Sequence, residues 1–289
     1  MIYSSTINSP NLSRLIDSSI NLIKKAENLA LHLSPEHGFW VAFSGGKDSQ
    51  VMYELVKMAG VRHTAIYNVT TNDPADNVRF IKKYYPEVQM LVPKESLLQM
   101  ISHKGLPSMF RRYCCERLKE RTGAGHVVVT GVRREESLKR AAYAEFSKMQ
   151  SDIPADKRKS YNLDSMEERN FECVKGKDKF LVHPILEWKE TDIWAFLRLF
   201  NIPINPCYDL HRRVGCVICP FALKGQITTY LKSHPKLRTA LLHSIQAYID
   251  RSPDTAPFPD AEVMFEWWLS KKSISEFKAL KKQTTLNFD

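Results

Sequence analysis

Short apolar runs alternate with helical segments along the first half of this chain of 289 residues, and this alternation constrains its fold most. Apolar runs at 39–43, 62–70, 88–92 and 127–130 are typical of buried strands. Strands separated by helices of about ten residues indicate βαβ units. We therefore predict an α/β fold with a doubly wound, mostly parallel sheet that is buried on both faces.

Helical spacing of apolar residues predicts the remaining elements. The expected helices lie at 12–33, 48–58, 74–85, 95–102 and 191–200. The chain from Pro220 onward is mostly helical in its pattern. The polar stretch from Leu138 to Lys179 lacks periodicity, and we predict a loop over a site or an insertion there.

Composition excludes several classes of protein. No apolar run reaches the roughly 18 residues that cross a bilayer, so we expect no membrane partner. The N-terminal stretch has neither a signal-peptide nor a transit-peptide pattern, which predicts a cytoplasmic protein. Lys and Arg number 42 against 32 Asp and Glu, and the net charge of +10 favours an anionic partner such as a nucleotide, a nucleic acid or an acidic protein.

A glycine turn follows the first predicted strand and reads Ser44-Gly45-Gly46-Lys47-Asp48-Ser49. Two glycines permit a bend that presents consecutive backbone N–H groups, and the following helix N-terminus adds partial positive charge, so the turn suits phosphate oxygens. Lys47 adds a formal charge, while Ser44 and Ser49 add hydroxyl donors. The simpler alternative is a tight turn in which Asp48 or Ser49 caps the helix.

Four segments, in order between about residues 38 and 222, carry a resemblance to a known family. Ser44–Ser49 resembles the PP-loop, S-G-G-x-D-S, of N-type ATP pyrophosphatases and of 3′-phosphoadenylylsulfate (PAPS) reductases. Arg112–Lys119, Gly131–Arg140 and His183–Trp194 are similar to that family's R-[WY]-C-x-x-x-L-K, G-[IV]-R-x-x-E-S-x-x-R and P-[IL]-x-x-W-x-x-x-D-[VI]-W elements. The resemblance implies an adenine nucleotide alpha-hydrolase-like fold with a helical C-terminal extension.

The same resemblance implies a set of nucleotide-binding residues: Ser44, Gly45, Gly46, Lys47, Asp48, Ser49, Thr70, Thr71, Gly131 and Arg133. The implied catalytic residues are Lys47, Asp48, Arg133 and Arg140. Asp48 would contact Mg²⁺ if ATP is the substrate, and the two arginines would clamp phosphate or neutralise charge. The alternative for Arg140 is a surface ion pair with Glu136.

The cysteines form the second chemical signal. Five of the six are the candidate metal ligands Cys114, Cys115, Cys207, Cys216 and Cys219, whereas Cys173 lies in the polar stretch and is treated as incidental. Clustered thiols in a reduced compartment more often hold metal than form disulfides. Four thiolates can bind Zn²⁺ or a [4Fe-4S] cluster, and spacing does not separate the two. The simpler alternative is that the thiols are small buried hydrophobic groups.

The resemblance favours the cluster, because the iron–sulfur branch of the adenylylsulfate reductases holds [4Fe-4S] with a Cys-Cys pair and a distant C-x2-C. Here Cys207 is a fifth candidate, so which four bind stays open, as does Zn²⁺.

The end of the sequence favours ATP over reductase chemistry. Assimilatory reductases carry a late nucleophilic cysteine in E-C-G-[IL]-H, whereas no cysteine follows Cys219 here. We therefore expect an ATP pyrophosphatase that forms AMP and pyrophosphate and activates a nucleic acid for sulfur insertion. The protein resembles the components of DNA phosphorothioation systems, which implies a cysteine desulfurase and other sulfur-transfer partners. The alternatives are a PAPS or adenylylsulfate reductase-like enzyme, and a subunit that binds nucleotide or nucleic acid without hydrolysis.

Two features suggest DNA as a partner. Residues 212–251 hold seven Lys or Arg and one acid, with Tyr230 and Tyr248 interleaved, although a solvated helical face explains this equally well. Residues 283–288 loosely resemble the Q-x-x-L-x-[LF] peptide that docks on sliding clamps.

The predicted organisation is an N-terminal helical segment (1–36), a PP-loop nucleotide-binding domain (37–205) and a region with the cysteine cluster and helices (206–289).

Overall fold

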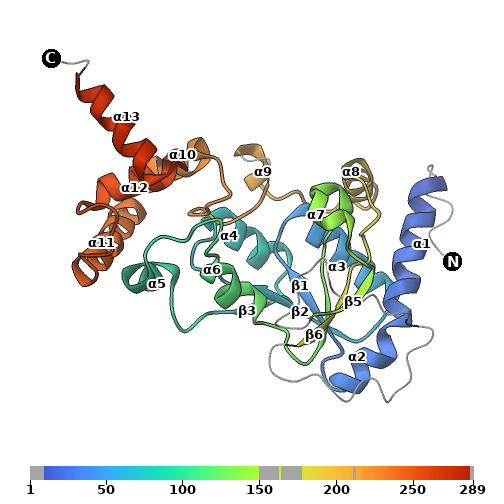
Figure 1. Ribbon diagram of the computed structural model, residues 1–289. Helices are drawn as coiled ribbons and strands as arrows, with labels where there is room; N and C mark the ends of the chain where they lie inside the picture. Colours follow the sequence, from blue (N-terminus) through green and yellow to red (C-terminus); the bar gives the residue numbers. More distant parts are fainter. Residues whose placement is uncertain (1–9, 150–162, 164–177, 211–212, 287–289) are drawn as a thin grey trace. The chain divides into compact units, whose positions relative to one another are not determined.

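The computed structural model describes residues 10–149, 163, 178–210 and 213–286 (Figure 1). The chain forms two compact units. The first contains Met1–Asn68, Ala75–Leu91 and Arg121–Val214, and the second contains Val69–Pro74, Val92–Glu120 and Gly215–Asp289. The chain therefore crosses between the units several times.

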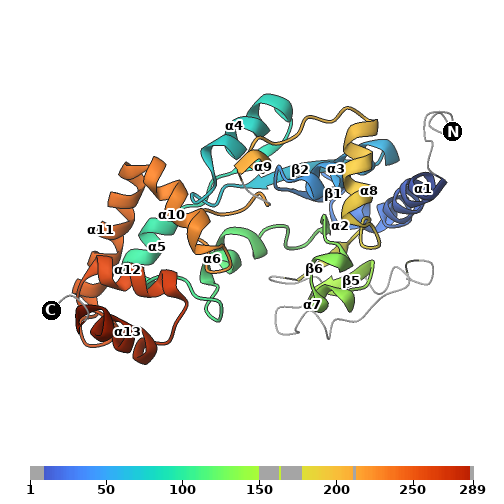
Figure 2. The same ribbon diagram turned by 90° about the horizontal axis from the view of Figure 1, so that it is seen from above.

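The first unit is built on a six-stranded sheet of order β3-β2-β1-β4-β6-β5. Figure 2 labels β1, β2, β5 and β6 of this sheet. Its strands are β1 (Phe39–Phe43), β2 (His63–Asn68), β3 (Gln89–Leu91), β4 (Val127–Val129), β5 (Phe146–Met149) and β6 (Lys179–Val182). All paired strands run parallel except β5 and β6. The predicted α/β class with a doubly wound, mostly parallel sheet is confirmed.

The strand order reverses beside β1. The chain proceeds from β1 to β2 and β3 on one side, then continues to β4 on the other side of β1. Val41 pairs with Ala65 of β2 and with Val129 of β4, and β4 is buried along its whole length. Ligands of such sheets bind beyond the carboxyl ends of the strands at this reversal.

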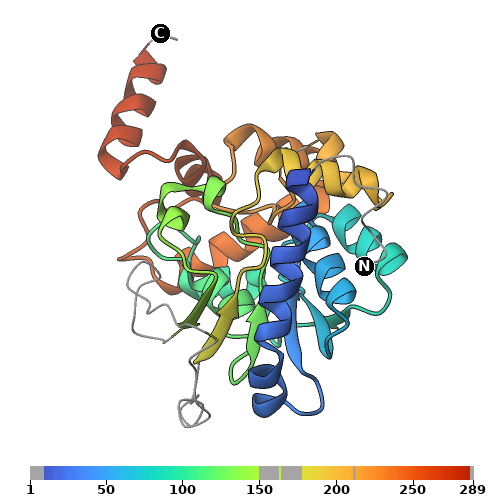
Figure 3. The same ribbon diagram turned by 90° about the vertical axis from the view of Figure 1, so that its right-hand side faces the viewer.

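Helices cover the sheet of the first unit. They are α1 (Pro10–Lys25), α2 (Glu27–Leu33), α3 (Lys47–Ala59), α4 (Ala75–Tyr84), α7 (Leu138–Ala141), α8 (Glu190–Leu199) and α9 (Cys207–Leu210). Helix α3 packs against both α1 and α8, and α1 runs along the outside of this layer, dark blue in Figure 3. The predicted leading helix is two helices that meet at Ala26.

The expectation of an irregular polar stretch at 138–179 is wrong at its described ends. Helix α7 and strand β5 form there, and β5 pairs antiparallel with β6 at the sheet edge. The pairing is stabilised by Phe146, which stacks on Phe180 with ring centroids 5.5 Å apart. The two apolar residues of β5, Phe146 and Met149, are three positions apart and do not give the alternation that is typical of a strand. Cys173 lies outside the described residues.

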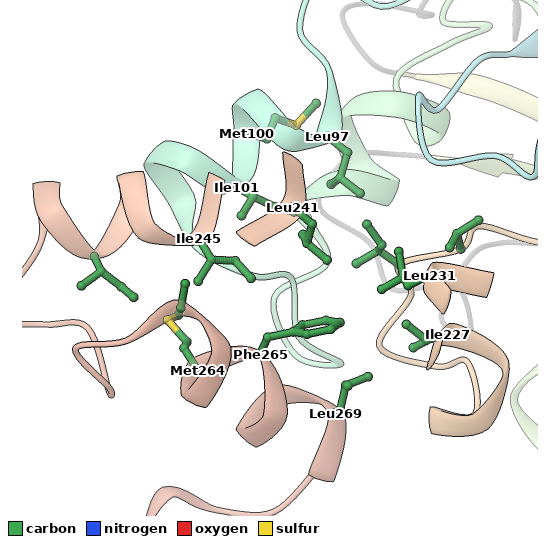
Figure 4. Packing of buried hydrophobic residues seen from close by; sticks show 14 of the residues in the cluster. Leu97, Met100, Ile101, Ile227, Leu231, Leu241, Ile245, Met264, Phe265 and Leu269 are labelled. Carbon is green, nitrogen blue, oxygen red and sulfur yellow. The ribbon is translucent and has the colours of Figure 1, made fainter. Parts of the chain in front are cut away.

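The second unit is helical. It contains α5 (Leu97–Lys104), α6 (Tyr113–Cys115), a π-helical turn (Glu116–Glu120), α10 (Lys224–Ser233), α11 (Pro235–Arg251), α12 (Ala261–Ser270) and α13 (Ile274–Leu286). Figure 4 shows its core, where Met100 and Ile101 of α5 lie with Ile245 of α11 and Phe265 of α12. Ser96 and Gln99 cap α5 reciprocally, and Asp260 caps α12.

These units differ from the predicted boundaries at 36/37 and 205/206. Residues 69–74 and 92–120 belong with the C-terminal helices. Helix α5 packs against α11, and Asn72 is hydrogen-bonded to Ile218. Residues 206–214 belong with the sheet. Among the described helices, none has both the length and the apolar character that crossing a membrane requires.

Candidate functional site

The glycine turn lies where β1 ends and α3 begins, at the strand-order reversal. Gly45 has φ +76°, and a Cβ there would lie 2.4 Å from Oδ1 of Asn77. Asn205, fully buried, donates its side-chain amide to the Gly45 carbonyl at 2.8 Å and to Asn77 Oδ1 at 2.7 Å. The turn therefore requires glycine and is fixed from behind by two buried amides.

The serines of the turn make bonds within it. Ser49 Oγ accepts from the Ser44 N–H at 3.2 Å and lies 3.0 Å from Ser44 Oγ. It donates to the Gly46 carbonyl at 2.8 Å. Ser49 thus closes the loop, in addition to lining the pocket that the loop forms.

Lys47, Asp48 and Arg133 form a connected charge cluster. Asp48 lies between the two cations, 3.1 Å from Lys47 Nζ and 2.6 Å from Arg133 Nε. Arg133 is 2% exposed and also donates to Glu135 at 2.7 Å. The structure therefore places Arg133 behind Asp48, as a residue that positions this carboxylate, and not in direct contact with the pocket.

Tyr208 of α9 lines the pocket at this loop and contacts the loop backbone. Its hydroxyl accepts a hydrogen bond of 2.8 Å from the Lys47 N–H, and the Lys47 ammonium lies 6.0 Å from its ring centroid. Burial raises the pKa of the Tyr208 phenol well above its usual value, so the group is a neutral hydroxyl. One amide of the loop is therefore already bonded to the protein's own side chain.

A pocket of about 220 Å³ opens at this loop, with Gly46, Lys47, Asp48 and Gly131 in its lining. A Cβ on Gly131 would lie 3.0 Å from the Asp48 backbone, so glycine allows β4 to approach the start of α3. The pocket combines the α3 N-terminus and Lys47 with the Asp48 carboxylate. Such an arrangement can hold phosphate oxygens together with a divalent cation.

Two further arginines line the pocket and share one carboxylate. Arg140 and Arg213 both form ion pairs with Glu136, the latter at 3.0 Å. Burial lowers the pKa of Arg140. The ion pair of Arg140 with Glu136 is therefore present, and a contact of Arg140 with phosphate stays a prediction. Arg212 lies outside the described residues.

Thr70 and Thr71, expected among the nucleotide-binding residues, belong to the second unit. Thr70 is buried, with Oγ1 3.7 Å from Sγ of Cys216. Thr71 has φ +54° and its hydroxyl accepts from the Leu97 N–H at 2.8 Å. The two threonines therefore make contacts within the second unit, to the C-x2-C turn and to the start of α5.

Four of the five candidate cysteines lie in the second unit. Cys114 and Cys115 are adjacent on α6, and a hydrogen bond from the Cys114 thiol, with Arg112 and Lys119 nearby, lowers the pKa of Cys115 to about 5. Lys119 Nζ donates to Sγ of Cys216 at 3.3 Å. Burial raises the pKa of Cys219, and the nearby Cys216 and Cys115 raise it further.

The turn that carries Cys216 and Cys219 is fixed by one buried asparagine. The Asn72 side chain accepts from the Ile218 N–H at 2.8 Å and donates to the Ile218 carbonyl at 3.0 Å. The Asn72 carbonyl accepts from the Val217 N–H at 2.8 Å. The segment after β2 thus holds the C-x2-C turn.

The four thiols fit a thiolate-bound metal in donor type and in their cationic surroundings. Among the described residues, however, no three His, Cys, Asp or Glu side chains stand in a metal-holding arrangement. Cys207 belongs to the first unit, where its N–H donates to Asn205 and burial raises its thiol pKa to about 11.

Sequence reasoning missed three parts of the loop site: Tyr208, Asn205 and the Glu136–Arg213 ion pair. Tyr208 and Asn205 lie close to Cys207 in the chain, and the sequence predicts this segment only as the source of a candidate metal ligand. No short-range pattern signals any of these contacts, because each partner lies far away in sequence.

The fold and this site define a doubly wound α/β protein with a glycine loop and a charged pocket at the strand-order reversal. The phosphoadenosine phosphosulfate reductase domain matches residues 38–222, and the chain belongs to this family. An uncharacterized protein of Methanocaldococcus jannaschii is 24% identical over 95% of this chain and 61% of its own length. The chain thus spans less than two thirds of that relative.

Two further comparisons concern reductases. The adenosine 5′-phosphosulfate reductase of Allochromatium vinosum is 23% identical over 63% of this chain and 68% of its own length. A crystal structure of phosphoadenylyl-sulfate reductase from Candida auris, a phosphate complex, aligns with a TM-score of 0.44 at 14% identity over 73% of this chain and 96% of that one.

Proposed function

We propose that the protein is an ATP pyrophosphatase that cleaves ATP to AMP and pyrophosphate. The observation that supports this most is the Asp48 carboxylate in the lining of the anion pocket, beside Lys47. This carboxylate can hold the Mg²⁺ that accompanies ATP, and Lys47 and Arg133 beside it offset its charge toward the phosphates. Mg²⁺ bound there would neutralise charge on the phosphates.

The residues of the loop take distinct roles in this proposal. The α3 N-terminus and the Lys47 ammonium bind the phosphates that leave as pyrophosphate. Asp48 would hold the cation, with its orientation fixed by Arg133. Arg140 and Arg213 neutralise charge that develops on the bond between the α and β phosphates.

We further propose that the AMP moiety activates a nucleic acid for sulfur transfer, as in DNA phosphorothioation. An oxygen of the acceptor attacks the α phosphate of ATP and expels pyrophosphate. The terminal sulfur of a persulfide on a cysteine desulfurase partner then displaces AMP, and a thiol reductant cleaves the remaining S–S bond, which leaves sulfur on the acceptor and a disulfide on the thiols. The net charge of +10 supports an anionic acceptor. Exposed Lys232, Lys236 and Arg251 on α10 and α11 add to this support.

We propose that Cys114, Cys115, Cys216 and Cys219 hold the metal centre, a [4Fe-4S] cluster with Zn²⁺ as the alternative. All four come from one unit, and Arg112 and Lys119 lie beside the sulfurs. Such a centre would supply redox, sulfur-relay or structural chemistry. A reduced compartment such as the cytoplasm would keep these thiols available.

A second candidate function is reduction of an adenylylated sulfur compound. It is favoured by the similarity to the adenosine 5′-phosphosulfate reductase of Allochromatium vinosum. Incubation of the purified protein with Mg²⁺ and either ATP or adenosine 5′-phosphosulfate plus a thiol separates the two. Pyrophosphate release supports the first proposal, sulfite release supports the second, and ATP binding without turnover indicates a non-hydrolytic subunit.

Tail residues 283–288 remain a proposed sliding-clamp contact. Gln283–Leu286 continue α13, and Asn287 and Phe288 lie outside the described residues.

A further inference from the structure

The second unit contains a pocket of about 200 Å³ that the ATP chemistry does not use. Its walls include Phe110, Trp267, Trp268 and Cys219. Aromatic side chains from two segments far apart in sequence therefore meet beside one of the four clustered cysteines.

The two indole rings are held in place by the protein. Trp267 Nε1 donates to the Lys272 carbonyl at 3.0 Å, and Trp268 Nε1 donates to the Pro107 carbonyl at 2.5 Å. Trp268 also stacks on Phe265, with ring centroids 5.9 Å apart and planes at 17°. Because both N–H groups are bonded internally, the rings offer the pocket rigid apolar surface and not hydrogen-bond donors.

Phe110 contributes an open aromatic face at the same pocket. It is 98% exposed, and its neighbour Met109 is 44% exposed. A phenyl ring exposed to this extent beside an apolar pocket is typical of a contact surface.

The charge around these rings has one sign. Lys224, Lys271 and Lys272 line the pocket, and none of its described lining residues is acidic. Lys271 also donates to the Ala222 carbonyl at 2.8 Å. The lining therefore suits a ligand that is flat and apolar in one part and anionic in another.

We infer that this pocket binds an unpaired base of a single-stranded nucleic acid, with the adjoining phosphates on the lysines. Bases stack on aromatic rings irrespective of sequence, and lysines contact the backbone. The volume is below the roughly 300–1,000 Å³ of sites for drug-sized ligands, which suits one ring system. An apolar peptide would use the rings but would leave three lysines without a complementary charge.

This inference rests on the nucleic-acid part of the proposed function and adds a location for the acceptor strand. A base in this pocket lies beside Cys219, in the unit that carries the four thiols. The pocket therefore brings the acceptor to the proposed metal centre.

The test is fluorescence anisotropy of a short labelled oligothymidylate, titrated with the full chain in the absence of ATP. An abasic strand of the same length and charge is the comparison. We expect the strand with bases to bind roughly tenfold more tightly. Phe110→Ala should remove this difference, while Phe110→Tyr, which keeps the ring, should retain it.

Matched controls lie in the first unit. Tyr84→Ala removes a ring that is 44% exposed outside the pocket and should leave the base preference intact. Lys224→Ala with Lys272→Ala should weaken both strands and flatten the salt dependence, whereas Lys82→Ala with Lys83→Ala should not. Circular dichroism verifies that each variant is folded.

Equal affinity for the two strands, or a base preference that survives Phe110→Ala, would overturn the inference. Pyrophosphate release from ATP is measured separately and without nucleic acid. Equal affinity of the unsubstituted protein for the two strands, with pyrophosphate release intact, rejects only the pocket. A base preference without pyrophosphate release rejects only the proposed ATP chemistry.

Discussion

The Asp48 carboxylate accepts a hydrogen bond of 2.6 Å from Nε of Arg133, a residue 85 positions further along the chain. Their side chains are 18% and 3% exposed, so the bond is partly shielded from water. It joins the loop after β1 to the loop after β4 across the strand-order reversal. The orientation of the carboxylate in the anion pocket therefore depends on an arginine outside the pocket lining.

Arg133→Lys tests this positioning role. Lysine keeps the positive charge but lacks the planar guanidinium group, which donates to Asp48 and to Glu135 at the same time. We expect kcat for pyrophosphate release to fall by about tenfold or more, with a higher Mg²⁺ concentration at half-maximal rate. An unchanged Mg²⁺ dependence, measured with an enzyme-coupled pyrophosphate assay, would contradict the role.

Asp48→Asn should lower the rate of pyrophosphate release, measured in the same assay, by about 100-fold or more.

Tyr208→Phe should strengthen nucleotide binding. Its hydroxyl accepts from the Lys47 N–H, so a phosphate oxygen must displace it. Without the hydroxyl, we expect the free protein to lose about 1 kcal/mol of stability, and ATP to bind several-fold more tightly. Calorimetric titration and thermal unfolding measure the two effects. Weaker binding would mean that the hydroxyl contacts the nucleotide itself.

Gly45→Ala and Gly60→Ala form a matched pair. Both glycines have positive φ, at +76° and +70°. A Cβ on Gly45 meets Asn77 at 2.4 Å, whereas a Cβ on Gly60 meets nothing within 4 Å. We expect urea unfolding to show a loss of about 1 kcal/mol for Gly60→Ala and about 1–3 kcal/mol more for Gly45→Ala. Equal losses would show that the loop tolerates the added methyl.

Metal analysis of anaerobically purified protein tests the cysteine proposal. We expect about four iron and four acid-labile sulfide per chain, and their loss in Cys216→Ser. Chelation or this substitution should also destabilise the second unit, because metal binding is coupled to folding. Cys207→Ser should retain the metal, because Cys207 belongs to the first unit. One zinc and no iron would exclude the cluster, and metal loss in Cys207→Ser would change the ligand set.

The strands and helices near the loop could be predicted because their signals are local. Phe39–Phe43 is apolar and is followed by Ser44 and two glycines, and Lys47–Ala59 has helical periodicity. The loop motif likewise predicts that Lys47 and Asp48 lie together at the start of a helix, and both line the pocket there.

The remaining features depend on contacts between distant residues. Periodicity shows that α5 has a buried face, but it does not show that Ile101 packs with Ile245 and not on the sheet. For the same reason Arg133 was expected at the phosphates, since its motif contains no information on Glu135 or Asp48 as partners. Strands β5 and β6 were missed because four-residue strands beside a polar stretch carry too little pattern.

The identity of the bond that breaks in ATP tests the central proposal most directly. With ATP labelled in the α phosphate, and Mg²⁺, we expect labelled AMP and one pyrophosphate for each AMP, both lost in Lys47→Ala. Labelled ADP with inorganic phosphate, or product formation that Lys47→Ala leaves unchanged, would contradict the account.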